Sequence, residues 1–177
     1  ACPEIANTTL PGQFVHLSVS GMLAMRRPIS IMSVDKTNGT FDLLYKIVGE
    51  GTRQLAERKI GDILSAIGPI GNGFKMTDKK NPLLIGGGVG MPPIIAIAQY
   101  IKDNNFYNPY VILGSEIPFP FKTIVSNLSG FYSSKLHTMP QLEEWKIACG
   151  LTSLQSYEGV YNGFVTGLAK EYLDSLS

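Results

Sequence analysis

Charged residues, cysteines and long apolar runs are all scarce in this chain of 177 residues. Only 16% of the residues are Asp, Glu, Lys or Arg, and the formal net charge is +1. This balance excludes a disordered chain, which needs low hydrophobicity and high net charge, and it argues against a nucleic-acid binder, which normally carries a basic face. The longest apolar runs, such as residues 92–98, fall far short of the roughly 18 residues of a membrane span. We therefore predict a soluble globular protein with no nucleic-acid partner and no membrane span.

The two cysteines, Cys2 and Cys149, lie near opposite ends of the first 150 residues. They form no C-x-x-C pair and no His-rich cluster, so we expect no metal site within this chain. The low cysteine count and the lack of a secretory signal favour the cytoplasm. The chain also lacks an initial Met and opens on Ala1, which reads like the interior of a domain.

Alternating polar and apolar residues predict short strands in the first half of the chain. We expect these strands at residues 13–19, 29–34, 41–48 and 62–67, and a short helix at residues 51–58. Asn38-Gly39 lies between two of the strands and indicates a hairpin, because both residues tolerate a positive φ. Strands of this number and spacing favour a small antiparallel barrel or sandwich.

The pattern changes after a polar, charged stretch at residues 75–81, which we interpret as a linker. A short apolar strand is expected at residues 83–85, a helix at 92–102 and a second strand at 110–113. Strand, helix and strand at this spacing predict a βαβ unit with a parallel sheet. A last strand at 151–154 and a helix within 163–173 would complete it. We therefore expect two domains, an antiparallel barrel or sandwich at residues 1–80 and a Rossmann-like domain with a parallel sheet at residues 81–177.

Between the first parallel strand and its helix lies Gly86-Gly87-Gly88-Val89-Gly90. Glycines in this position let the backbone turn tightly and approach a phosphate, which then rests against the helix N-terminus. The pattern G-x-G-x-x-G fails at its third glycine, where Met91 stands, and no P-loop lysine follows. A plain strand-to-helix turn would need fewer glycines, so phosphate or pyrophosphate binding is the interpretation we favour.

Three motifs in the first half could also contact phosphate or a cofactor. Arg26-Arg27-Pro28-Ile29-Ser30 offers guanidinium groups suited to phosphate oxygens, and Gly51-Thr52 begins a helix whose N–H groups could hold an anion. Residues 68–74 form a glycine-rich segment after the last strand of the barrel. Taken singly, each motif also has a structural explanation: a solvated strand edge, a helix cap and a turn.

The order of these motifs resembles the ferredoxin–NADP reductase superfamily, whose members join a flavin-binding barrel to a nicotinamide-binding domain. Arg27-Pro28-Ile29-Ser30 is similar to the flavin motif of the branch that contains the electron-transfer subunit of dihydroorotate dehydrogenase. The resemblance continues in order through Leu44-Tyr45-Lys46, Gly51-Thr52, the glycine-rich segment at 68–74 and the turn at 86–93.

This resemblance implies a role for each motif. Arg27 would pair with the pyrophosphate of FAD, Pro28 and Ile29 would lie in the same motif, and Ser30 would act near the reactive flavin nitrogen as the catalytic residue. The other cofactor-binding residues that it implies are Leu44, Tyr45 and Lys46 along the flavin, Gly51 and Thr52 at its phosphates, and Gly86, Gly87, Gly88, Val89, Gly90, Pro93 and Gly114 for NAD(P)H. Electrons would pass from NAD(P)H through FAD to a partner protein such as a catalytic dehydrogenase subunit.

The sequence departs from the family in three respects. The cysteine cluster that holds a [2Fe–2S] centre in this branch is absent, so that centre is not expected from this chain. A Cys-Gly-Pro element is also absent, since Leu151 follows Cys149-Gly150 and no buried strand is expected before them. We also find no counterpart of the first barrel strand or of the last Rossmann strands, and expect both to be missing.

Two other functions remain open at this point. An NAD(P)-dependent dehydrogenase without flavin would need a catalytic His or a Tyr-Lys pair in the second half, which we do not find. A non-catalytic, degenerate reductase fold that binds or regulates a partner would explain the missing cysteine cluster. The choice between NADH and NADPH is also open, although Glu116, after the second parallel strand, favours NADH through ribose hydroxyl contacts.

Overall fold

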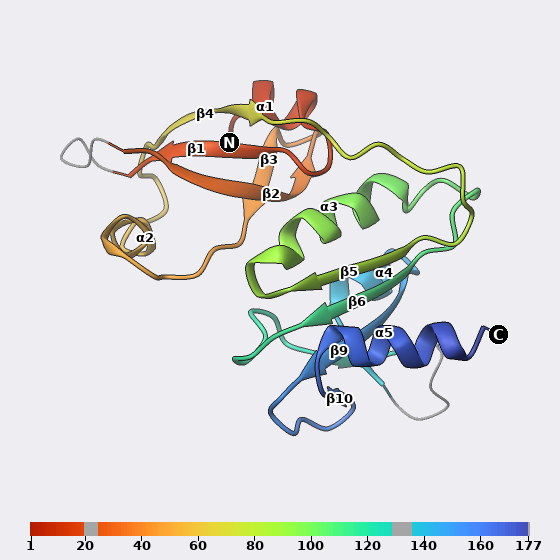
Figure 1. The fold of residues 1–177 in the computed structure, drawn as a ribbon. Helices are drawn as coiled ribbons and strands as arrows, with labels where there is room; N and C mark the ends of the chain where they lie inside the picture. Colours follow the sequence, from red (N-terminus) through yellow and green to blue (C-terminus); the bar gives the residue numbers. More distant parts are fainter. Residues whose placement is uncertain (20–24, 129–135, 177) are drawn as a thin grey trace. The chain divides into compact units, whose positions relative to one another are not determined.

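The chain is described by a computed structural model that covers residues 1–19, 25–128 and 136–176. It divides into two compact units, Ala1–Lys75 and Met76–Ser177. Figure 1 shows that the first unit is built mainly of strands, whereas helices pack on the sheet of the second.

The first unit contains an antiparallel sheet and two short helices. Its strands are β1 (Phe14–Ser18), β2 (Arg27–Asp35), β3 (Thr40–Leu43) and β4 (Ser65–Ile70), in the order β3-β2-β1-β4, and its helices are α1 (Pro3–Thr8) and α2 (Glu50–Ala56). Every neighbouring pair of these strands is antiparallel. The arrangement confirms the antiparallel sheet expected for the first domain.

Alternation along β1 and β2 builds the core of this unit. Val15, Leu17, Ile29 and Ile31 are buried on one face of the sheet, as expected where apolar residues recur at every second position. Leu55 of α2 joins the same cluster, and burial of such a side chain stabilises the fold by about 1.5–3 kcal/mol. Leu55 therefore fixes α2 against the sheet.

The predicted hairpin is confirmed, with Gly39 at φ +62° between β2 and β3. The strand predicted at 41–48 was wrong beyond Leu43, because the chain leaves the sheet there and Tyr45 packs against the core. The strand predicted at 62–67 is shifted, since β4 begins at Ser65. The helix α1 was not predicted; it is six residues long and has no side-chain cap.

The second unit contains a parallel sheet in the order β10-β9-β6-β5. Its strands are β5 (Leu83–Gly87), β6 (Tyr110–Gly114), β9 (Ala148–Ser153) and β10 (Tyr161–Asn162), and its helices are the 3₁₀ turn η1 (Gly88–Gly90), α3 (Met91–Ile101), α4 (Pro140–Glu144) and α5 (Val165–Asp174). A small antiparallel pair, β7 (Ile124–Val125) with β8 (His137–Thr138), completes the described elements. The predicted βαβ unit and Rossmann-like sheet are thereby confirmed.

All five residues of β6 are buried, as a central parallel strand requires. Tyr110 and Ile112 pack against Leu168 of α5. Alternate residues of a strand point to opposite faces, so Val111 and Leu113 lie on the other face of the sheet. The helix α3, which contacts both β5 and β6, packs on that face. In α/β folds of this kind, ligands bind at the carboxyl ends of the strands.

In the described parts of the chain, no helix has the length and apolar character needed to cross a membrane.

Candidate functional site

Arg27 begins β2, and its guanidinium lies against the first turn of α2. A β-carbon added at Gly51, which is buried, would lie 2.6 Å from Arg27 Cζ. The guanidinium donates to the carbonyl of Met25 over 3.0 Å. Among the described residues, no ion pair joins it to a carboxylate. The structure therefore brings two of the predicted phosphate-contact residues together and leaves an uncompensated positive charge beside them.

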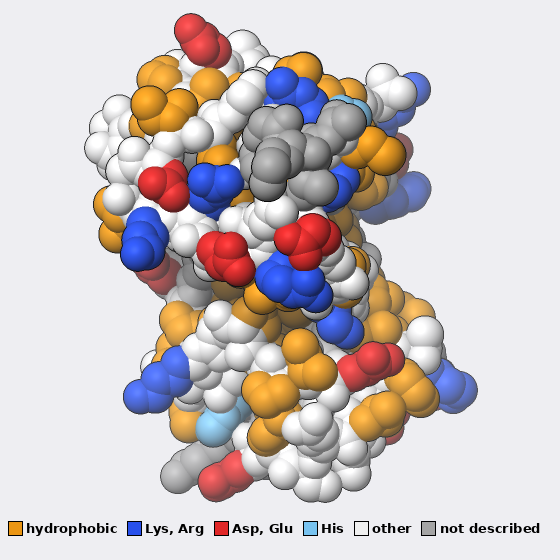
Figure 2. Space-filling model, turned by 90° about the vertical axis from the view of Figure 1, so that its left-hand side faces the viewer, with side chains coloured by type: hydrophobic (Ala, Val, Ile, Leu, Met, Phe, Trp, Pro, Cys, Tyr) orange, Lys and Arg blue, Asp and Glu red, His pale blue; other side chains and the backbone are white. Residues whose placement is uncertain are grey.

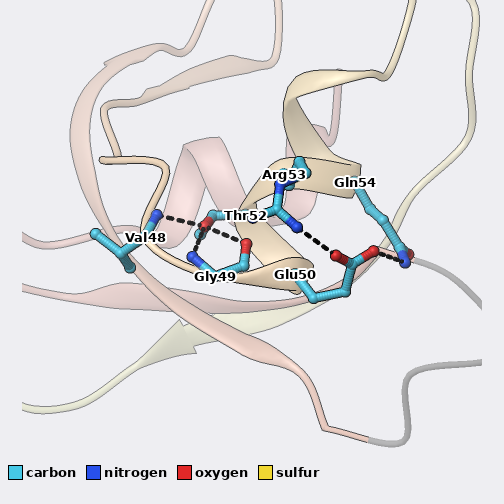
Figure 3. A network of polar contacts seen from close by, with 6 residues as sticks. All are labelled: Val48, Gly49, Glu50, Thr52, Arg53 and Gln54. Atoms are coloured by element: carbon cyan, nitrogen blue, oxygen red, sulfur yellow. Dashed lines mark hydrogen bonds and ion pairs between the residues drawn. The ribbon is translucent and has the colours of Figure 1, made fainter.

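The start of α2 is held by its own polar contacts (Figure 3). Thr52 Oγ1 accepts the N–H groups of Val48 and Gly49, at 3.0 and 3.2 Å, and donates to the carbonyl of Gly49 at 3.1 Å. These bonds close the turn before the helix. Thr52, predicted to contact phosphate, thus uses its hydroxyl to shape the turn on which Gly51 stands.

Glu50 places a carboxylate at the same turn, and this carboxylate is bound by two other side chains of α2. Its two oxygens accept from Arg53 at 2.7 Å and from Gln54 at 2.8 Å (Figure 3). The hydrogen bond from Gln54, followed by the charge of Arg53, lowers the pKa of Glu50. These contacts do not involve the guanidinium of Arg27.

The neighbouring Arg26 has a different role. Its guanidinium donates to the carbonyl and the hydroxyl of Ser65, at 3.0 and 2.9 Å, and so ties the start of β2 to β4. Of the two adjacent arginines, Arg26 holds the sheet and Arg27 faces α2.

The other predicted flavin residues are close to Arg27 or to α2 in the sequence and differ in how far they are buried. Ile29 belongs to the core, whereas Pro28 is exposed and Ser30 is half-buried opposite Phe14. The predicted residues Leu44, Tyr45 and Lys46 form part of the irregular segment between β3 and α2, with Lys46 exposed.

The glycine turn after β5 contains glycines of three kinds. A β-carbon on Gly86 would lie 2.8 Å from the carbonyl oxygen of Gly90 and 2.9 Å from Ile94 Cγ1, so close packing of strand and helix requires Gly86. Gly88 has φ +53°, a region that favours glycine. At Gly90 an added β-carbon would meet nothing within 4 Å, and at Gly87 only a carbonyl at 3.9 Å. The fold does not require these last two glycines, and their open backbone suits the approach of a phosphate.

The end of β6 lies beside this turn, since Gly114 is paired with Gly87. A β-carbon at Gly114 would lie 2.5 Å from Val165 Cγ1 and 2.8 Å from Thr152 Oγ1, so close packing against α5 and β9 accounts for this predicted cofactor residue. The predicted Val89 is 62% exposed, and Pro93 is half-buried in the first turn of α3. The two predicted segments thus meet at the carboxyl edge of the sheet.

One contact at this edge was missed by the sequence reasoning. Gln155 Nε2 donates to the carbonyl of Glu116 at 3.0 Å, and the amide of Ser115 donates to the carbonyl of Thr152 at 3.0 Å. Both bonds join the chain after β6 to the end of β9 and fix the backbone that carries the exposed Glu116. No local signal could reveal a contact between residues so far apart in the chain.

Cys149 is the second residue of β9 and is paired with Val111 of β6. The strand predicted at 151–154 begins earlier than expected, because β9 starts at Ala148 and includes the buried Cys149 and Gly150. Burial raises the pKa of the Cys149 thiol to about 12, and burial likewise raises the pKa of Tyr110. Both groups stay protonated near neutral pH, so neither is poised as a nucleophile.

No metal cluster is found among the described residues, and the face in Figure 2 carries charges of both signs. No group of three or more His, Cys, Asp or Glu side chains in the described ranges could hold a metal ion. On the face in Figure 2, Lys and Arg side chains are interspersed with Asp and Glu, and hydrophobic side chains lie among them.

Known proteins resemble this chain in sequence and in fold. Residues 6–74 match the family model of the oxidoreductase FAD-binding domain. The chain is 33% identical over 179 residues to the electron transfer subunit of dihydroorotate dehydrogenase B (NAD(+)) from Bacillus cereus strain B4264, and 32% identical to that of Bacillus mycoides strain KBAB4. The chain belongs to the FAD-binding oxidoreductases of the ferredoxin–NADP reductase superfamily. In both alignments the match covers 85% of this chain and 66% of the Bacillus subunit.

Solved structures of this superfamily share the fold. The structure of NADH-dependent reduced ferredoxin–NADP oxidoreductase matches 97% of this chain and 56% of its own, with a TM-score of 0.76 and 25% identity. Ferredoxin–NADP⁺ reductase from Plasmodium falciparum matches 96% of this chain and 67% of its own, with a TM-score of 0.59 and 15% identity. This second likeness concerns the fold alone.

Proposed function

We propose that this chain binds FAD in its first domain and NAD(P)H in its second, at residues 1–80 and 81–177, and passes electrons from NAD(P)H through FAD to a partner protein. The position of Arg27 over Gly51 carries this proposal. It joins two motifs from separate elements into one cationic cradle, as a pyrophosphate requires. Bound FAD would supply the redox chemistry, which side chains lack.

The residues of the first unit would hold and orient the flavin. Arg27 would neutralise the pyrophosphate, and glycine at position 51 would leave the space that the Arg27 guanidinium occupies beside the first turn of α2. The contacts of Thr52 would keep that turn in shape. Ser30, for which no side-chain hydrogen bond is found among the described residues, is proposed as the hydroxyl next to the reactive part of the flavin.

The second unit would bind the nicotinamide dinucleotide at the carboxyl edge of its sheet. Gly87, Gly88 and Gly90 would bring backbone N–H groups to the pyrophosphate, next to the start of α3. NADH is the proposed donor, because the exposed carboxylate of Glu116 would repel the additional phosphate of NADPH.

The partner is proposed from the relatives. The Bacillus proteins are named as electron transfer subunits of a dihydroorotate dehydrogenase, so we propose a catalytic dehydrogenase subunit as the electron acceptor. The absence of a usable nucleophile among the residues discussed above agrees with an electron-transfer role.

Arg27→Ala tests the proposal in the full-length protein. Loss of charge-assisted hydrogen bonds should weaken FAD binding by roughly tenfold to a hundredfold, measured by flavin content and titration with FAD. Arg53→Ala is the matched control, since Arg53 is an exposed arginine of α2 that pairs with Glu50; it should leave FAD binding unchanged.

The visible spectrum before and after anaerobic addition of NADH tests the activity itself. The flavin absorption should appear in the purified protein and bleach on addition. A colourless protein that takes up no added FAD would overturn the proposal, and flavin that stays oxidised with both NADH and NADPH would contradict the assigned donor.

A further inference from the structure

The chain passes between its two compact units once, between Lys75 and Met76. The sequence suggested a polar linker over residues 75–81. Hydrogen bonds on both sides of Lys75–Met76 show that most of this stretch belongs to one unit or the other.

On the amino-terminal side, the segment that ends at Phe74 is bound to the first unit. The amide of Phe74 donates to the carbonyl of Pro11 at 2.8 Å, and Gln13 Nε2 donates to the carbonyl of Gly71 at 2.8 Å. The ring of Phe74 lies over Gly12, where an added β-carbon would be 2.7 Å from Cε2. The first unit therefore holds the chain as far as Phe74.

On the carboxyl-terminal side, the second unit takes hold of the chain at Thr77. Tyr107 Oη donates to the carbonyl of Thr77 at 2.8 Å, and the amide of Asn108 donates to the carbonyl of Lys80 at 2.7 Å. The amide of Lys79 donates to Thr77 Oγ1 at 3.0 Å and closes a local turn. The residues from Thr77 onward are thus attached to the loop before β6.

Two residues remain between these attachments. Lys75 is exposed and Met76 is half-buried, and no hydrogen bond is found for either among the described residues. Hinges are short segments of this kind, whose dihedral angles absorb a change in orientation while both sides stay intact.

We propose that Lys75 and Met76 form the hinge between the two units, and that the Tyr107–Thr77 hydrogen bond sets its length. A hinge of two residues restricts the units far more than a free linker of seven would. The inference rests on contacts within each unit and not on the cofactors proposed above.

Hydrogen exchange of the full-length protein tests the bounds of the hinge. The amides of Lys75 and Met76 should exchange at least about tenfold faster than that of Phe74, because a lost hydrogen bond of about 1.4 kcal/mol corresponds to that factor. Equal protection of Lys75 and Phe74 would overturn the assignment.

Distance distributions between spin labels test its mechanics. Labels at the exposed sites Lys36→Cys and Thr166→Cys, in a Cys2→Ser background, would report on the first and second units. Lys75→Pro fixes one φ angle and should narrow the distribution. An unchanged width would overturn the hinge.

Tyr107→Phe removes only the hydroxyl that holds Thr77, and should broaden the same distribution as the hinge lengthens. Tyr100→Phe, at an exposed tyrosine of α3, is the matched control and should have no effect. Equal widths for the two variants would overturn the role of the Tyr107–Thr77 bond, and the exchange result would still decide whether Lys75 and Met76 are the hinge.

Discussion

The two candidate sites of this protein are built in opposite ways. In the first unit, Arg27 of β2 and Gly51 of α2 come from separate elements, and a charged side chain supplies the binding group. In the second unit, Gly86–Gly90 are consecutive residues, and the backbone itself is the proposed binding group. Removing a side chain therefore tests the first site, whereas adding one tests the second.

The largest effect is expected from Gly86→Val, which separates packing from binding within the glycine turn. The added side chain would collide with the carbonyl of Gly90 and destabilise the second unit by about 2 kcal/mol, as overpacking does. Trp145 is the single tryptophan of the chain and lies in this unit, so denaturant unfolding followed by its fluorescence gives the measurement. An unchanged midpoint would contradict the assigned packing role.

Gly51→Ala should act on the first site alone. The methyl group would displace the Arg27 guanidinium and weaken FAD binding by about tenfold. Alanine is a better helix former than glycine, so α2 itself should not be weakened. Flavin titration measures the affinity, and Glu57→Ala, just after the same helix, serves as control. Equal losses of FAD affinity in Gly51→Ala and Glu57→Ala would contradict the proposed contact of Gly51 with Arg27.

Gly90→Ala sharpens the contrast with Gly86. Its methyl group would enter open space, so stability should hold while NADH affinity falls by about fivefold as the backbone is shielded. Parallel measurements of unfolding and of nucleotide binding check this. A loss of stability similar to that of Gly86→Val would remove the distinction between the two glycines.

The smallest effect is expected from Glu116→Gln. Removing the carboxylate should reduce the preference for NADH over NADPH by about threefold, because the repulsion of a phosphate at an exposed site is screened. The affinities for both nucleotides should be compared with those of Glu158→Gln, another exposed carboxylate of this unit. Loss of binding for both nucleotides would point to a structural role for Glu116 instead.

Local features of the fold could be predicted because they depend on a few neighbouring residues. The hairpin at Gly39 and the strand-turn-helix at Gly86–Gly90 follow from allowed backbone dihedrals and from the apolar period. The end of β3 was not predictable in this way, since Tyr45 leaves the strand to reach a core formed by other elements.

The candidate sites show the same division. Motif order in the sequence indicated the family, and the comparisons confirmed it. The particular contacts of Gln155 with Glu116, and of Tyr107 with Thr77, lie outside what a linear pattern contains, because they join segments brought together by folding.

The sequence by itself determined a two-domain flavoprotein fold, through strand periodicity, the glycine turn and the order of its motifs. The tertiary structure decided which of two adjacent arginines faces α2. Neighbouring residues at the start of a strand point in different directions, so the pairing of β1 with β4 and the packing of Leu55 left Arg26 on Ser65 and Arg27 on Gly51.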